Sequence, residues 1–138
     1  MRRESIELVQ DSFPRVAAIA PQAAALFYDR LFEIDPGARP LFQKRDMDLQ
    51  GQKLMATLGY LVGMLYRPES LVPAAQDLAR RHVVYGVTLP QYESVGSALL
   101  WTLEQGLGEA FTPELRAAWV EVYSTLAEVM RAAATESA

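Results

Sequence analysis

The chain of 138 residues contains no cysteine and only one histidine, His82. The lack of cysteine excludes disulfides, thiolate zinc sites, iron–sulfur clusters and cysteine nucleophiles. One histidine without cysteine also excludes a tetrahedral zinc site built from the usual ligands. Three interpretations of the single imidazole stay open: a surface residue, a packed core residue, or the one protein ligand of a group that needs only one.

The chain also lacks a long hydrophobic run and a basic cluster. Its longest mostly apolar stretch, LMATLGYLVGMLY, has 13 residues, whereas a transmembrane helix takes about 20. The N-terminal stretch MRRESIELVQDSF has no apolar core of signal-peptide length. A net charge of -4 argues against DNA or RNA as the main partner. We therefore expect no nucleic-acid and no membrane partner, in a protein suited to the cytoplasm.

Apolar side chains make up 51% of the chain and recur with helical spacing, as in Leu54, Leu58, Leu61 and Leu65. No stretch alternates with period 2 for long. The pattern predicts an all-α fold in a single domain, residues 1–138. The expected helices cover 3–17, 21–34, 36–43, 47–65, 70–85, 89–107 and 112–133. Their unequal lengths favour helices that cross at large angles over a symmetric four-helix bundle.

Local signals mark several helix ends. Asp35 precedes Pro36 and Thr112 precedes Pro113, so both are predicted N-caps. The short link AFTPEL predicts that the last two long helices are antiparallel neighbours.

The sequence also lacks several motifs that carry chemistry. There is no Glu-x-x-His pair, Gly-rich phosphate loop, G-x-S-x-G or EF-hand loop. A Ser–His–Asp triad is not excluded by counting, but nothing places a serine on a strained turn. One neutral imidazole suits an axial position on an iron whose other four ligands come from a porphyrin. A lone histidine more often has no ligand role, but Leu78 shares its helix face and Arg80 and Arg81 beside it could meet carboxylates.

Four stretches, LFYDRLFEIDPGARPLF, QGQKLM, RRHVVYGV and YESVGSALL, resemble the globin family. The similarity is to bacterial single-domain haemoglobins and the haem domain of flavohaemoglobins. The final third, GSALLWTLEQGLGEAFTPELRAAWVEVY, is similar to neuroglobin. The resemblance extends from about residue 5 to 131. It implies a globin fold, with helices layered three over three around a pocket for haem b.

The resemblance also implies roles for individual residues. His82 is expected to be the proximal iron ligand, and Phe42 to wedge against the haem face. Tyr28 and Gln50 are expected to stabilise the gas ligand on the distal side. Lys53 is expected either to reach a haem propionate or to be simply solvated. The remaining expected pocket residues are Leu54, Leu78, Arg81, Val87, Tyr92 and Val95.

The choice of distal glutamine depends on the register of one segment. A shift of two residues would exchange Gln50 for Gln52. Leu54 and Leu58 face inward in the predicted helix, and Gln50 is in phase with them whereas Gln52 is not. We therefore prefer Gln50.

The resemblance implies a protein that binds O2 tightly, also takes CO and NO, and acts as a possible nitric oxide dioxygenase. Because the chain ends at Ala138, we expect no flavin domain and an external reductase. The glutamate that supports the proximal histidine in flavohaemoglobins is replaced at Ala134, and Glu136 is out of phase, which puts peroxidase-like chemistry in doubt. The alternatives are a haem-based gas sensor that acts through a partner and a helical domain without haem. We expect a monomer or weak homodimer.

Overall fold

The computed structural model describes residues 1–137, and the side-chain surroundings of residues 1–136. No strand occurs in this part of the chain, so the all-α prediction is confirmed. All helix ends but one fall within two residues of their predicted positions. The exception is the end of α6, which was predicted at residue 133 and lies at Ser137. The elements are α1 (Arg3–Ala17), α2 (Ala20–Ile34), the 3-10 helix η1 (Pro36–Phe42), α3 (Met47–Gly63), α4 (Pro68–Tyr85), α5 (Gln91–Leu107), the 3-10 helix η2 (Gly108–Ala110) and α6 (Pro113–Ser137).

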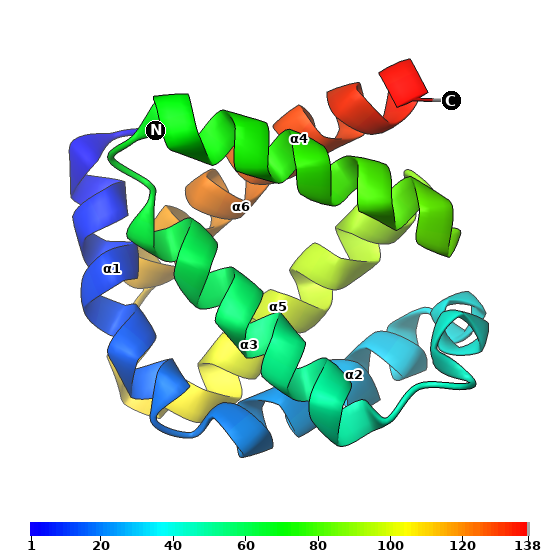
Figure 1. Cartoon of the computed structure of the whole chain (residues 1–138). Helices are drawn as coiled ribbons and strands as arrows, with labels where there is room; N and C mark the ends of the chain where they lie inside the picture. The colour runs from blue at the N-terminus through cyan, green and yellow to red at the C-terminus, as the bar shows by residue number, and fades with distance from the viewer. Residues whose placement is uncertain (138) are drawn as a thin grey trace.

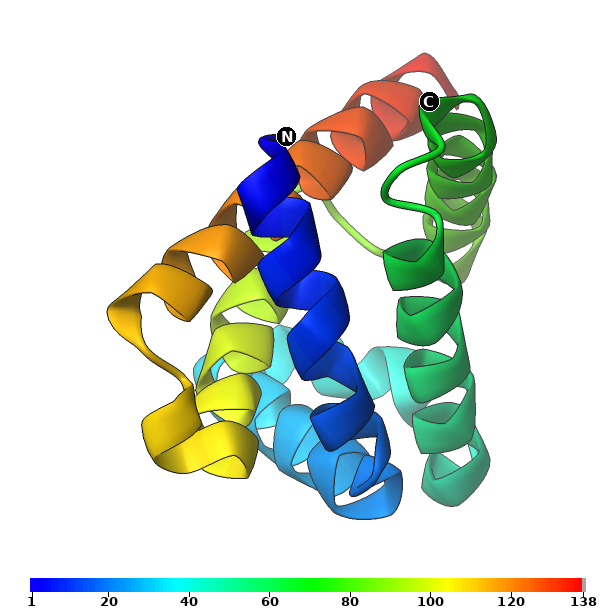
Figure 2. The same ribbon diagram turned by 90° about the vertical axis from the view of Figure 1, so that its left-hand side faces the viewer.

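The helices cross at large angles, as their lengths predicted. In Figure 1, α3 passes in front of α5 and α4 runs across the top of the molecule. The turned view places α3 and α4 on one side and α5 with the first half of α6 on the other (Figure 2). Both α1 and α2 pack against the two sides, since α1 contacts α3 and α6 while α2 contacts α3 and α5. The prediction of a layered fold in place of a four-helix bundle is therefore confirmed.

The core lies where α1, α5 and α6 meet. Val9 and Leu103 are almost completely enclosed, with exposed fractions of 0% and 1%. Trp119 is also buried, and its indole N–H donates a hydrogen bond of 3.0 Å to Ser12 Oγ. This bond satisfies the indole N–H of a residue that otherwise supplies apolar contact area, and it ties α6 to α1. Within the described range, no helix is long and apolar enough to cross a membrane.

The two predicted N-caps behave differently. Thr112 Oγ1 accepts a hydrogen bond of 3.2 Å from the backbone N–H of Leu115, as expected of a cap. Asp35 does occupy the N-cap position of η1, as predicted, but its side chain makes no capping hydrogen bond. Pro36 has no N–H, and the N–H of Ala38 instead donates to the backbone carbonyl of Asp35 at 3.0 Å. The tight 3-10 turn thus uses the main-chain oxygen in place of the carboxylate.

The last two long helices are antiparallel neighbours, as predicted. The Tyr123 hydroxyl in the middle of α6 donates to the backbone carbonyl of Tyr92 at the start of α5. The other end of α5 leads through η2 directly into the first turn of α6. This pairing places α6 against the start of α5, the helix that follows the one carrying His82.

Candidate functional site

Two expected site residues from different helices meet directly. Tyr28 lies on α2 and Gln50 in the first turn of α3, and Gln50 Nε2 donates a hydrogen bond of 3.2 Å to the Tyr28 hydroxyl oxygen. Tyr28 is 7% exposed and Gln50 is half-buried, whereas Gln52 is exposed. The structure therefore brings Gln50 and not Gln52 to the tyrosine. We call the space beside this pair the distal side.

The environment of Tyr28 keeps its phenol neutral. Burial raises the pKa of Tyr28 above its usual value and outweighs the Gln50 hydrogen bond and the positive charge of Arg45, which act in the opposite direction. A neutral phenol retains its O–H as a donor. Because its oxygen already accepts from Gln50, that proton is free to be donated to something else.

Phe42 belongs to an aromatic cluster beside Tyr28. Its ring centroid lies 5.3 Å from that of Tyr28 in an edge-to-face arrangement, and 5.7 Å from that of Phe32. The Phe32 ring is also 6.0 Å from that of Tyr28. Phe32 was not among the residues expected at the site, although its spacing of four residues from Tyr28 was a usable signal. The short helix η1 thus delivers Phe42 to the distal aromatic cluster.

His82 lies near the end of α4 with its ring partly buried. Its Nδ1 atom is enclosed and has no hydrogen-bond partner among the described residues. Burial is the main cause that holds the pKa of His82 below its usual value, and Arg81 adds to this effect. The backbone carbonyl of Leu78, one turn earlier, acts to raise the pKa of His82. Its position relative to Nδ1 does not have the geometry of a full hydrogen bond. Because Nδ1 is sealed inside the protein, Nε2 is the nitrogen available to a ligand.

Tyr92 packs against His82 from α5. The two ring centroids are 6.4 Å apart and the planes differ by 26°, which is a stacked arrangement. Tyr92 is 5% exposed, and its hydroxyl is enclosed without a hydrogen-bond partner in the described part of the chain. The guanidinium carbon of Arg131 lies 5.8 Å from the centre of the Tyr92 ring. We call the space around these rings the proximal side.

The structure reveals a second tyrosine on the proximal side that the sequence analysis did not identify. Tyr123 donates its hydroxyl proton to the Tyr92 carbonyl and so helps to hold the first turn of α5. Burial raises the pKa of Tyr123 strongly.

On the same helix, Ala134 is buried and Glu136 is exposed, in agreement with the phase expected for them.

The expected apolar pocket residues share an intermediate burial. Each packs against the core clusters yet keeps some exposed surface. Three of them lie on helices and the fourth, Val87, lies in the loop between α4 and α5; the helical ones are Leu54, Leu78 and Val95. Partial exposure of inward-facing apolar side chains is what a site for a large flat apolar group requires.

Two expected charged residues lie at the edge of this region. Lys53 and Arg81 are both exposed, and Arg81 forms an ion pair of 3.6 Å with Asp77 one turn earlier. A cavity of about 370 Å³ lies between α3 and α4, and Leu78 and Arg81 are among the residues that line it. The cavity therefore opens beside the helix that carries His82.

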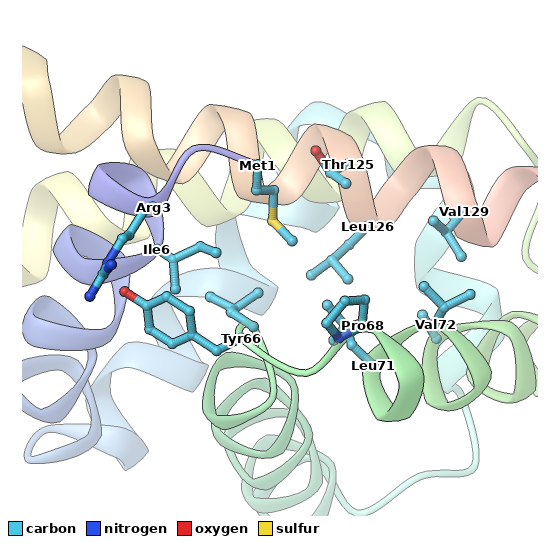
Figure 3. A pocket seen from close by; sticks show the side chains of 12 residues that line it. Met1, Arg3, Ile6, Tyr66, Pro68, Leu71, Val72, Thr125, Leu126 and Val129 are labelled. Atoms are coloured by element: carbon cyan, nitrogen blue, oxygen red, sulfur yellow. The ribbon is translucent and has the colours of Figure 1, made fainter.

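A second cavity is lined by a different set of residues. It has a volume of about 720 Å³ and is lined mainly by apolar side chains from the start of α1, the turn before α4, the first half of α4, and α6 (Figure 3). None of the site residues expected from the sequence lines it. Volume alone therefore does not identify the functional site, because the titratable and unpartnered polar groups lie elsewhere.

The arrangement suits a cofactor that brings its own metal ligands. Within residues 1–137, no group of three or more His, Asp or Glu side chains could hold a metal ion. His82 alone therefore cannot build a metal site from protein ligands. The region combines a partly buried imidazole that has one enclosed nitrogen, partly exposed apolar side chains, and exposed cations at its edge. This combination fits a porphyrin iron that needs one ligand from the protein.

Known proteins similar to this chain agree with that chemistry. A family model described as Globin matches residues 25–130. A protein named Flavohemoprotein from Rhodopirellula baltica is 31% identical over 131 residues, which cover 94% of this chain and 32% of the relative. Another protein of that name, from Rhizobium meliloti, is 28% identical over 132 residues, which cover 94% of this chain and 33% of the relative. The chain thus spans about a third of the length of these curated relatives.

Proposed function

The chain belongs to the globin family, and on this premise we propose that it is an oxygen-binding haem protein with His82 as the proximal ligand and a Tyr28–Gln50 pair on the distal side. The family and its relatives establish the haem cofactor and the binding of gases such as O2. The assignment of residues and the strength of binding are our proposal. The single observation that carries it is the hydrogen bond from Gln50 to Tyr28.

Haem, when bound, supplies an iron centre that takes small gases, with O2, CO and NO as the ligands expected here. The chain holds this group through the Nε2 atom of His82, while apolar side chains of α3, α4 and α5 exclude water from its faces. Lys53 and Arg81 at the edge are suitable partners for its carboxylates. The ion pair of Arg81 with Asp77 involves one guanidinium nitrogen, Nη2, of the three that carry N–H donors.

On the distal side, Tyr28 is the principal donor. Its phenol proton is free, its oxygen is held by Gln50, and burial keeps it protonated. A hydrogen bond to a neutral acceptor is worth about 0.5–1.5 kcal/mol, and one to a charged acceptor about 1.5–3 kcal/mol. O2 polarised in the pocket gains this energy, whereas CO, which is nearly nonpolar, gains less. We therefore expect tight O2 binding with slow release.

We further propose oxidation of nitric oxide as an activity of the oxygenated protein. Nitric oxide and O2 combine with one electron to give nitrate, and an external reductase supplies the electron. Support comes from the two relatives named Flavohemoprotein, whose similarity covers nearly the whole of this chain. The measurement is nitrate formed per nitric oxide consumed, with and without a flavin reductase.

The experiment for the haem assignment is a spectrum of the purified protein after haem reconstitution. We expect a Soret band that moves on reduction and again under CO. His82→Gly should lose the proximal nitrogen ligand, and imidazole in the buffer should restore it. Arg80→Gly is the matched control, because it also puts glycine into α4 at an exposed position. A His82→Gly spectrum identical to that of the control would contradict ligation by His82.

A further inference from the structure

The last turn of α4 leaves two neighbouring apolar side chains in solvent. Val84 is 83% exposed, more than any other exposed large apolar residue of the described chain, and Tyr85 is 50% exposed. Arg80 and Arg81 lie one turn earlier on α4, so each shares a helix face with one of these two side chains. Adjacent exposed apolar side chains that are bordered by polar ones are typical of an interaction surface, whereas scattered single ones are not.

A second segment, far away in the sequence, lies against this turn. The guanidinium carbon of Arg45, in the loop before α3, is 5.2 Å from the centre of the Tyr85 ring. A Cβ added to Gly86 would lie 3.4 Å from Cδ2 of Leu41 in η1. Figure 1 shows the same approach between the end of α4 and η1 at the right-hand edge of the molecule. The end of α4 and the loop before α3 therefore form one continuous surface.

Positive charge gathers on these two segments. Residues 39–53 and 77–90 contain six of the 13 basic side chains of the chain but only three of its 17 acidic ones, although the whole chain has a net charge of -4. All six basic side chains are exposed. Two of the acidic ones are engaged, because Asp77 pairs with Arg81 and Asp46 accepts two backbone N–H groups of α3. We use the name α4-end surface for the cations Lys44, Arg45, Arg80 and Arg81 together with the apolar residues Val84 and Tyr85.

We propose that the α4-end surface is the docking site of an acidic flavin protein that donates one electron at a time. The inference rests on the proposed function, which requires an external electron donor. One electron leaves the reduced flavin of the donor and reduces the ferric haem iron. Tyr85 places the surface beside the iron ligand, because its ring centroid lies 6.2 Å from that of His82.

The chemistry of the surface agrees with such a partner. An apolar centre bordered by cations fits a partner with an acidic rim, since complementary charge speeds the encounter and fixes the orientation. A small surface is sufficient, because complexes for electron transfer bury little area. A membrane would also attract cations, but it would make no use of an aromatic ring that packs against His82.

The test uses the haem-loaded protein and a flavodoxin, an acidic flavin protein, as the probe. Val84→Glu puts a negative charge at the centre of the surface, and Val84→Lys puts a positive charge at the same exposed position. Lys44→Glu changes the second segment, and Arg116→Glu makes the same change at an exposed position of α6. NMR titration gives the dissociation constant of oxidised flavodoxin, and stopped flow gives the rate constant for haem reduction by reduced flavodoxin. Reduction by the neutral semiquinone of lumiflavin, which needs no docking, is the internal control.

At low ionic strength we expect Val84→Glu and Lys44→Glu to weaken binding and to slow reduction by flavodoxin about tenfold, the lower end of what electrostatic steering contributes. Val84→Lys should not slow it, and Arg116→Glu should stay close to the wild type. Equal slowing in Arg116→Glu would show an effect of net charge and overturn the docking site. Equal slowing with lumiflavin would overturn it too, because the change would then act on the haem and not on docking.

Two further outcomes concern the wild type. Absence of flavodoxin binding would overturn the proposed partner and leave the proposed function intact, and binding to phosphatidylglycerol vesicles would then identify the α4-end surface as a membrane contact. A wild type that takes up no haem would overturn the proposed function and this inference with it.

Discussion

Gln50 Nε2 lies 3.2 Å from the Tyr28 hydroxyl oxygen, so a side chain from the first turn of α3 is fixed against one in the middle of α2. The amide donates, and the phenol proton is therefore left unused within this pair. The pair is formed by the folded chain alone, which means that little reorganisation is needed when a ligand enters. Donors that are already oriented in a dry space stabilise a polar ligand more than mobile ones do.

Tyr28→Phe should speed the release of O2. The change removes the phenol proton and also the oxygen that holds Gln50 in place. Loss of one hydrogen bond of about 1.5 kcal/mol corresponds to roughly a tenfold faster release. Stopped-flow release of O2 measures this directly. Release of CO is the internal control, since that ligand gains little from a donor, and equal acceleration of both gases would contradict the assignment.

Gln50→Ala and Gln52→Ala provide a matched pair two residues apart. Gln50 is half-buried and bonded to Tyr28, whereas Gln52 is exposed. We expect Gln50→Ala to accelerate O2 release by several-fold, because the loss of a net hydrogen bond is worth about 1 kcal/mol. Gln52→Ala should leave the rate unchanged. If only Gln52→Ala speeds release, the distal glutamine has been assigned to the wrong residue.

The helices could be predicted from the sequence because their signals are local. Leu54, Leu58 and Leu61 repeat with helical period, and Thr112 with Pro113 marks the start of α6 within two residues. Asp35 is at the N-cap position as predicted, but its side-chain bond is absent, because the choice between its carboxylate and its carbonyl depends on the tightness of the turn that follows. A local pattern does not contain that information.

Parts of the site could not be predicted, because they depend on how distant helices pack. The contact of Arg131 with Tyr92 joins residues from α6 and α5, and the Tyr123 hydroxyl reaches a carbonyl of α5. The resemblance to globins did point to Tyr28, Gln50 and His82. Their roles remain predictions, although the first two do meet in space.

Acidification should destabilise the haem-free protein through His82. Burial holds the pKa of His82 below its usual value, so the unfolded chain takes up this proton at a higher pH than the folded chain does. Its contribution to stability is therefore present above the unfolded pKa of about 6.5 and is lost as the pH falls through the lower folded value. Urea unfolding from about pH 7.5 to 5.5 measures this dependence. Because His82 is the only histidine, His82→Gln should flatten it in this window, and an unchanged slope would contradict the argument.

Gly51→Ala should destabilise the protein and disturb the distal side together. A Cβ at position 51 would lie 2.8 Å from the Cβ of Ala24, which is itself buried on α2 and cannot rotate away. The two helices must separate, at a cost of about 1–3 kcal/mol. Gly63→Ala in the same helix is the control, because nothing lies within 4 Å of the added Cβ there.

The control should be neutral or gain about 0.4–1 kcal/mol, since alanine restricts the unfolded chain more than glycine does. Urea unfolding compares the two variants. Gln50 is adjacent to Gly51, so separation of α3 from α2 should also weaken its bond to Tyr28 and speed O2 release in Gly51→Ala alone. If Gly51→Ala proves as stable as Gly63→Ala, the α2–α3 crossing relaxes freely. The position of Gln50 is then not set by the contact between Gly51 and Ala24.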